Sequence, residues 1–168
     1  AVREHLRYYP HDVWLYQQAA AWTAIGQDEH LAPRAGMAGD DLGSRLVTAR
    51  VCRTGVQLAF LQERRYAPYD KWLGTALARL DSTAPLRSAL TATLAASQWQ
   101  ERQARLGDVL VELVRRHNTL ALTAPFLREW SAQPASRYLY TVALADNHTI
   151  ELDPYEASLG LDYAVIGE

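Results

Sequence analysis

Residues 39–65, GDDLGSRLVTARVCRTGVQLAFLQERR, decide the fold because they have the composition and spacing of one long helix. Apolar residues follow two of its sides at intervals of three, four and seven. The two apolar stripes consist of Leu42, Leu46, Ala49, Val56 and Phe60, and of Val47, Val51 and Leu58. A helix that is apolar on two sides needs neighbours on both. We therefore expect this segment to be the central helix of an all-α bundle.

Two polar stripes lie between the apolar ones. They consist of Asp41, Ser44, Arg45, Thr48, Cys52 and Glu63 on one side, and of Arg50, Arg53, Gln57 and Arg64 on the other. One stripe can face water. The other must be paired in the interior or line a cleft, because unpartnered buried charges are very costly. The pattern leaves open which stripe is covered.

The amino-acid composition excludes several classes of function. A chain of 168 residues is the size of one domain. Lys71 is the only lysine among 17 basic residues; guanidinium groups suit carboxylate and phosphate, although a GC-rich genome gives the same bias. The net charge of −2 argues against a broad nucleic-acid or membrane surface. The lone Cys52 excludes an internal disulfide and fits the reducing cytoplasm, where we expect the protein.

Five helices follow from the periodicity and the breakers. They are predicted over residues 13–30, 39–65, 69–80, 83–96 and 98–120. Asp12 is expected to cap the first, and Asp40 or Asp41 the second, with Pro33 and Gly36 in a short connection between them. Residues 1–130 thus form a bundle of five to six helices. Residues 131–168 form a tail packed on the bundle, with a hairpin over 137–152 and one more short helix.

Two acids open the central helix, and an arginine follows one turn later. Asp40 and Asp41 are candidates to hold a metal or to accept a hydroxyl proton. Arg45, with the amides of the helix N-terminus, is a candidate to bind phosphate. The alternative is a capped helix with an Asp41–Arg45 ion pair, which stabilises an exposed helix only slightly.

Residues 63–72, ERRYAPYDKW, gather charged and aromatic side chains around a helix break. Loops on a rigid scaffold commonly contact ligands. Stacking by Tyr69 or Trp72, with charge from Arg64 and Lys71, suits a nucleotide or another phosphorylated ligand. The alternative is that Trp72 and Leu73 anchor a helix in the core while the charges face water. The five histidines have no metal-ligand spacing, so no metal site is expected.

Four blocks in order carry a family resemblance. They are YPHDVWLY (9–16), RAGMAGDDLGSRLVTARVCR (34–53), ERRYAPYDKWLGTALARL (63–80) and HNTLALTAPF (117–126). They resemble a helical domain of unknown function (family number 4037) that forms the C-terminal half of nucleotidyltransferase-like bacterial proteins, similar in arrangement to aminoglycoside nucleotidyltransferases. Gly43-Ser44 is not followed by the Asp-x-Asp of the catalytic half. The resemblance implies that the catalytic domain precedes Ala1 in a longer protein.

The resemblance implies a substrate-binding, cleft-completing helical domain that is not catalytic in isolation. Positioning and electrostatics dominate such transfers. We expect Arg45, Arg50, Arg64 and Lys71 to neutralise phosphate or acidic groups and Tyr69 and Trp72 to stack, while Asp40, Asp41 or Glu63 orients or deprotonates an acceptor hydroxyl. Mg²⁺ and a nucleoside triphosphate are expected only with the N-terminal nucleotidyltransferase domain, the predicted partner.

A second hypothesis is a non-enzymatic interaction or dimerisation module. Such bundles also resemble the HEPN group, some members of which are ribonucleases with an arginine four to six residues before a histidine. In that motif four to six residues lie between the arginine and the histidine, and no histidine of this chain has an arginine at that separation; the pair Arg7 and His11 has three residues between them. On this hypothesis the arginine stripe pairs with an acidic partner or with a second copy of the chain.

Overall fold

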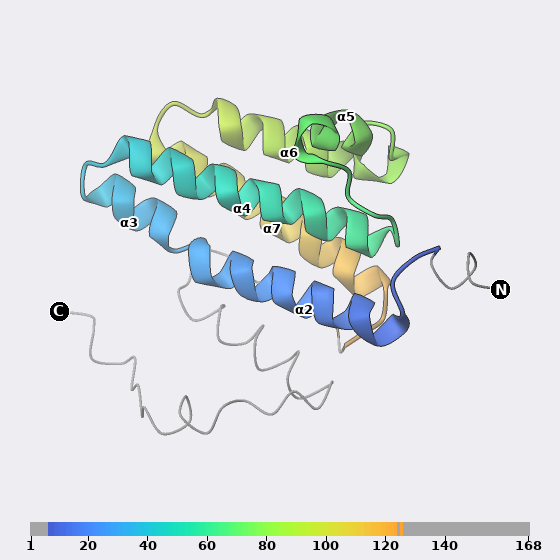
Figure 1. The fold of residues 1–168 in the computed structure, drawn as a ribbon. Coiled ribbons are helices and arrows are strands. Elements are labelled where there is room, and N and C mark those ends of the chain that lie inside the picture. The colour runs from blue at the N-terminus through green and yellow to red at the C-terminus, as the bar shows by residue number, and fades with distance from the viewer. Residues whose placement is uncertain (1–6, 124, 126–168) are drawn as a thin grey trace, which may run out of the picture.

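The computed structural model describes residues 7–123 and 125, which form a helical bundle (Figure 1). The α-helices are α2 (His11–Asp28), α3 (Leu31–Met37), α4 (Asp41–Gln62), α5 (Leu73–Leu77), α6 (Ala84–Ala95) and α7 (Trp99–Thr119). Two short 3-10 helices, η1 (Asp70–Trp72) and η2 (Asp81–Thr83), precede α5 and α6. The described residues contain no strand, and the all-α prediction is confirmed. The predicted hairpin and tail lie outside the described residues.

The long helix α4 lies at the centre, as its sequence predicts. It packs against α2, α3 and α7, and α6 packs on α7. Figure 1 shows α4 between α2 and α6, with α7 behind it. Leu58 of α4 and Leu106 and Leu113 of α7 are fully buried in the shared core. Gly55 lets the two helices approach closely, because a Cβ there would lie 3.0 Å from Leu113 Cδ1.

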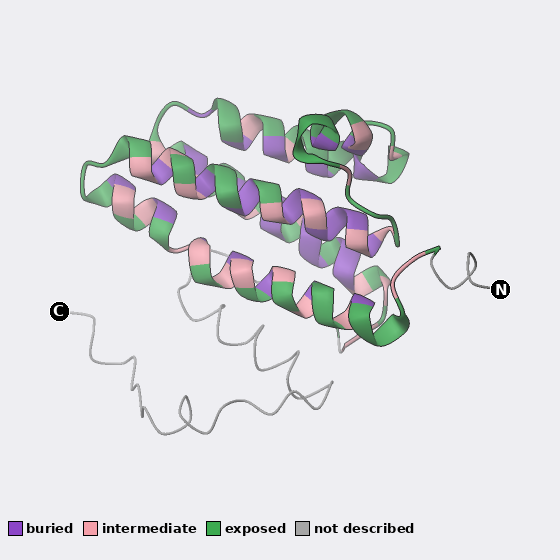
Figure 2. Ribbon diagram, in the orientation of Figure 1, coloured by how far each residue is buried: buried purple, intermediate pink, exposed green. Residues whose placement is uncertain are grey.

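The covered side of α4 differs from the prediction at its N-terminal end. Leu42 and Leu46 are 69% and 63% exposed, and Ala49 is exposed as well. Instead, the small polar residues Ser44 and Thr48 are buried. Figure 2 shows how exposure along α4 gives way to burial toward its C-terminal half. Assigning Leu42 and Leu46 to the core was therefore wrong, because the helix buries its small side chains to let α7 come close.

The polar stripe of Ser44, Thr48 and Cys52 is thus the covered one. Thr48 Oγ1 donates to the carbonyl oxygen of Ser44 at 2.8 Å, so its hydroxyl is satisfied within the helix. The opposite stripe is at the surface, where Arg50 pairs with Asp28 and Arg53 with Asp70. Exposed ion pairs of this kind contribute little to stability.

One predicted helix cap and one predicted connection are wrong, and one predicted cap is confirmed. Pro10 is the N-cap of α2, so Asp12 lies in the first turn, where its charge complements the helix dipole. Pro33 lies in the first turn of α3 rather than in a connection, since its missing N–H has no intrahelical partner to lose there. Asp40 caps α4 as predicted, because its Oδ1 accepts the Gly43 N–H at 2.7 Å.

Helix α4 ends three residues earlier than expected, at Gln62. Arg64 has a φ of 51°, in the left-handed region. The Arg65 N–H donates to the Phe60 carbonyl at 2.9 Å, and the Arg64 N–H to the Leu61 carbonyl at 3.0 Å. This is the Schellman pattern, which usually places glycine where Arg64 stands. The next predicted helix, over 69–80, is reduced to η1 and α5.

None of the described helices is long and apolar enough to cross a membrane.

Candidate functional site

Two buried arginines of α7 hold α4 near its two ends. Arg102 is 2% exposed and Arg116 is 6% exposed. Arg102 reaches the start of α4, where it meets Asp41, and Arg116 reaches the end, where it meets Glu63. Because a buried guanidinium needs several acceptors, these contacts fix how the two long helices lie against each other.

At the start of α4, the carboxylates already have partners. Arg102 Nη2 donates to Asp41 Oδ1 at 2.6 Å and to Ser44 Oγ at 3.0 Å. Arg45 Nε donates to Asp41 Oδ2 at 2.7 Å, and Arg45 Nη2 to the Ser97 carbonyl at 2.6 Å. The hydrogen bonds from Arg45 and Arg102 hold the pKa of Asp41 below its usual value. With Asp40 engaged as the cap, this cluster has a structural role.

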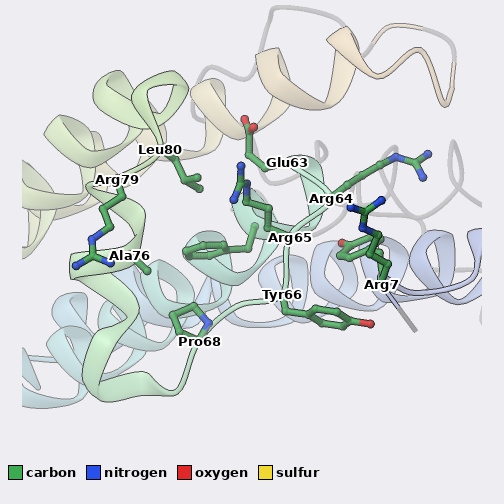
Figure 3. A pocket seen from close by; sticks show the side chains of 11 residues that line it. Arg7, Glu63, Arg64, Arg65, Tyr66, Pro68, Ala76, Arg79 and Leu80 are labelled. Carbon is green, nitrogen blue, oxygen red and sulfur yellow. The ribbon is translucent and has the colours of Figure 1, made fainter. Parts of the chain in front are cut away.

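At the end of α4 the chain forms a groove of about 710 Å³. It is lined by Arg7, Tyr8, Phe60, Glu63, Arg64, Arg65, Tyr66, Pro68, Ala76, Arg79 and Leu80. Figure 3 shows Arg79, Ala76 and Leu80 on one side, Arg7, Arg64 and Tyr66 toward the other, and Arg65 between them. Four of the lining residues are arginines and one is an acid.

The acid of the groove, Glu63, is already neutralised. Its Oε1 accepts from Arg116 Nη2 at 2.5 Å and from Ser82 Oγ at 2.7 Å. Arg116 also donates to the Ser82 carbonyl at 2.8 Å and to Gln62 Oε1 at 3.2 Å. The hydrogen bond from Ser82, followed by that from Arg116, lowers the pKa of Glu63 below its usual value. Glu63 is therefore an ionised carboxylate held in place by a buried cation.

Arg64 is positioned by an aromatic residue of α2. Its guanidinium carbon lies 3.9 Å from the centroid of the Trp14 ring. Trp14 is itself fixed, because it is buried and its Nε1 donates to the Leu61 carbonyl at 2.7 Å. Stacking on a ring face leaves the in-plane N–H groups of a guanidinium available for an anion.

A tyrosine cluster flanks the same side of the groove. The Tyr66 ring centroid lies 5.2 Å from that of Tyr8 and 4.7 Å from that of Tyr9. Burial, and the neighbouring Tyr9, raise the pKa of Tyr8 to about 12. Its hydroxyl therefore stays neutral and contributes no negative charge to the groove.

The predicted site residues are spread over the molecule. Only Glu63 and Arg64 come together in the groove. Asp40, Asp41 and Arg45 lie at the other end of the 22-residue α4, about 30 Å away along a helix of that length. Arg50 is on the outer surface, bound to Asp28 through two hydrogen bonds of 2.6 Å.

The other three predicted ligand contacts precede α5. Lys71 Nζ lies 5.1 Å from the Trp72 ring centroid, and Tyr69 and Trp72 are exposed. None of these three residues lines the groove. Leu73, but not Trp72, anchors this segment in the core. Their role in ligand binding stays a prediction.

Sequence reasoning missed Arg7, Tyr8, Arg65, Tyr66 and Arg79 as site residues. Arg65 and Tyr66 belong to the segment already singled out, so a signal for them was present. Arg7 precedes α2 and Arg79 follows α5, and only the tertiary fold brings them to the end of α4. Among the described residues, no three His, Cys, Asp or Glu residues gather where they could hold a metal ion.

Residues 1–73 match the model of a family described as Domain of unknown function (DUF4037). The family predicted from the sequence blocks is thus confirmed over that part of the chain. Searches among curated proteins and among solved structures found no match. The family match includes most of the groove residues but ends before Ala76, Arg79 and Leu80.

Proposed function

We propose that this chain is the substrate-binding, cleft-completing helical domain of a nucleotidyltransferase-like bacterial protein. The groove at the end of α4 receives the phosphate-bearing part of its ligand. The observation that carries the proposal is the arginine rim. Arg7, Arg64, Arg65 and Arg79 line a groove in which Glu63, the only acid among the described lining residues, is already paired. The resemblance of the sequence blocks supports the same assignment, and the family match over residues 1–73 agrees with that resemblance.

The charge balance favours an anion. The C-terminal end of a helix carries roughly half a negative charge, which opposes anion binding there. Four guanidinium groups outweigh that partial charge, and Arg116 offsets Glu63. Within residues 7–123 and 125, Arg7, Arg65 and Arg79 have no carboxylate within 4 Å. Their planar donors match the geometry of phosphate oxygens.

The nucleotidyl transfer itself is carried out by another domain. Mg²⁺ and the transfer chemistry belong to an N-terminal nucleotidyltransferase domain, and the groove of this chain contributes contacts to a phosphate group of the nucleotide. The chain by itself does not catalyse transfer. The proposal places the protein in the cytoplasm, where the single Cys52 stays reduced.

Calorimetric titration with ATP, GTP, CTP and UTP in the presence of Mg²⁺ tests the proposal. We expect at least one nucleotide to bind, and its affinity to fall between about 50 and 200 mM salt because the contacts are ionic. If none of the four nucleotides binds at either salt concentration, the groove does not bind nucleotides. An affinity that does not change with salt would show that the arginines of the groove do not bind the nucleotide.

A second candidate function is an interaction or dimerisation module. It is favoured by one observation: Met37, Leu42 and Leu46 are large apolar residues exposed near the junction of α3 and α4. If this surface joins copies of the chain, size-exclusion chromatography with light scattering will show a dimer that Leu42→Ser and Leu46→Ser dissociate. If ion pairing joins them, Arg50→Ala will have that effect instead. A monomer at all concentrations contradicts dimerisation.

A further inference from the structure

Glu63 has one carboxylate oxygen that the fold uses and one that it leaves available. Both hydrogen bonds to the side chain, from Ser82 and from Arg116, go to Oε1. Oε2 receives none from the residues that the structure describes. The side chain is 30% exposed and lines the groove. The groove therefore presents a hydrogen-bond acceptor among its four guanidinium groups.

This acceptor is fixed in place. Arg116 is buried and bound to Gln62 and to the Ser82 carbonyl as well as to Glu63. Gln62 is anchored in turn, because its Nε2 donates to the Leu113 carbonyl at 3.0 Å. The exposed Arg65 lies beside this carboxylate (Figure 3), and its charge also lowers the pKa of Glu63. A preorganised polar group selects more strongly than a mobile one.

An ionised carboxylate accepts hydrogen bonds but cannot donate them. The low pKa of Glu63 keeps it ionised at neutral pH. An anionic ligand group placed against Oε2 is repelled, and an ammonium group is repelled by the four surrounding guanidinium groups. A neutral hydroxyl satisfies Oε2 without either cost, and hydrogen bonds to charged groups are the stronger ones.

From this geometry we propose that the groove selects phosphate esters that also carry a hydroxyl group, with the arginines holding the phosphate and Glu63 Oε2 accepting the hydroxyl. The substrate class is that of phosphorylated sugars, polyols and nucleotides. This inference rests on the proposed function, since it refines what the same groove binds.

The test compares glycerol 3-phosphate with propyl phosphate, which has the same carbon count and phosphate group but no hydroxyl. Titrations of the 168-residue chain are followed by NMR or calorimetry. We expect glycerol 3-phosphate to bind about tenfold more tightly, as one charge-assisted hydrogen bond implies. In Glu63→Gln the preference should shrink to less than about threefold. Asp70→Asn removes an equal charge outside the groove and should keep the full preference.

The possible outcomes distinguish the hydroxyl selection from the phosphate site itself. Equal affinity for both esters in the unaltered chain overturns the hydroxyl selection and leaves an unselective anion site. A preference that persists in Glu63→Gln, with native helical content by circular dichroism, overturns the role of Glu63. If neither ester binds at millimolar concentration, both the hydroxyl selection and the phosphate site fail. The comparison of ligands on the unaltered chain needs no variant to fold.

Discussion

Arg116 Nη2 lies 2.5 Å from Glu63 Oε1, and this buried contact joins α7 to the last turn of α4 at the edge of the groove. The same pair has two consequences. It holds α4 and α7, the two longest of the described helices, in register. It also neutralises Glu63, the acid among the described groove residues, which would otherwise weaken an anion site. Arg102 and Asp41 form the corresponding contact at the other end of α4.

Removing Arg116 should destabilise the fold. Arg116→Met leaves Gln62 Oε1 and the Ser82 carbonyl without this donor, and leaves Glu63 with the Ser82 hydroxyl but no cation bound to it. The cost should be about 2 kcal/mol, at the low end for a broken buried pair because Glu63 is partly solvated. Urea unfolding measures it. Arg53→Met is the control, since Arg53 pairs with Asp70 at the surface and should cost less than about 0.5 kcal/mol. Equal losses in the two variants would contradict the account.

Removing Arg102, which contacts the N-terminal end of α4, should also destabilise the fold. Arg102→Met leaves Asp41, Ser44 and the Ala96 carbonyl without a shared donor. We expect a loss of about 1–2 kcal/mol in the free energy of unfolding, mainly from the buried Ser44 hydroxyl and Ala96 carbonyl, because Asp41 is half-exposed and keeps its bond to Arg45. The neighbouring Arg105, which is exposed and 3.7 Å from Asp108, provides the control. If Arg105→Met lowered the free energy of unfolding as much as Arg102→Met, burial of Arg102 would not be what stabilises the fold.

The two glycines Gly36 and Gly26 should respond oppositely to alanine. A Cβ at Gly36 would lie 2.4 Å from Trp99 Cγ and 2.7 Å from Trp99 Cβ, so α3 must move away from α7. Gly36→Ala should cost roughly 1–3 kcal/mol. Gly26 lies in α2 with nothing within 4 Å of such a Cβ, and Gly26→Ala should stabilise by about 0.5–1 kcal/mol. Thermal unfolding distinguishes the two, and stabilisation by Gly36→Ala would refute the close helix contact.

Stability should fall in acid through the paired carboxylates. The pKa values of Glu63 and Asp41 lie below their ordinary values of 4.5 and 3.8 in the folded chain. The unfolded chain therefore takes up protons first as the pH falls, and the stabilisation present above about pH 5 is lost progressively below it. Urea unfolding between pH 7 and pH 3 should show this loss, and Glu63→Gln should make it shallower. Identical pH profiles would show that the pair is not linked to folding.

Much of the fold follows from the sequence, and the reasons are specific. The helices from Ala84 and Trp99 begin where proline and the apolar repeat place them. The central helix is identified by its length, but helical spacing alone could not decide which polar stripe was covered. That choice depends on Arg102, which satisfies Asp41 and Ser44 from another helix.

A signal for the buried arginines was present in the sequence. Arg102 stands between Trp99 and Leu106, and Arg116 stands three residues after Leu113, both on the covered side of α7. Charged residues on an apolar stripe indicate buried pairs. The sequence indicates the groove residues less clearly. Arg7 and Arg79 reach it from segments that only tertiary packing brings together, so a local motif could not identify them.

The central claim is that the arginine rim binds a phosphate-bearing ligand. The most direct measurement is calorimetric titration of Mg²⁺-ATP into the unaltered chain, Arg79→Ala and Arg50→Ala. Arg79 lines the groove and has no described ion pair, whereas Arg50 is bound to Asp28 on the outer surface. We expect about a tenfold loss of affinity for Arg79→Ala and less than a twofold change for Arg50→Ala. Equal affinities in all three proteins would contradict it.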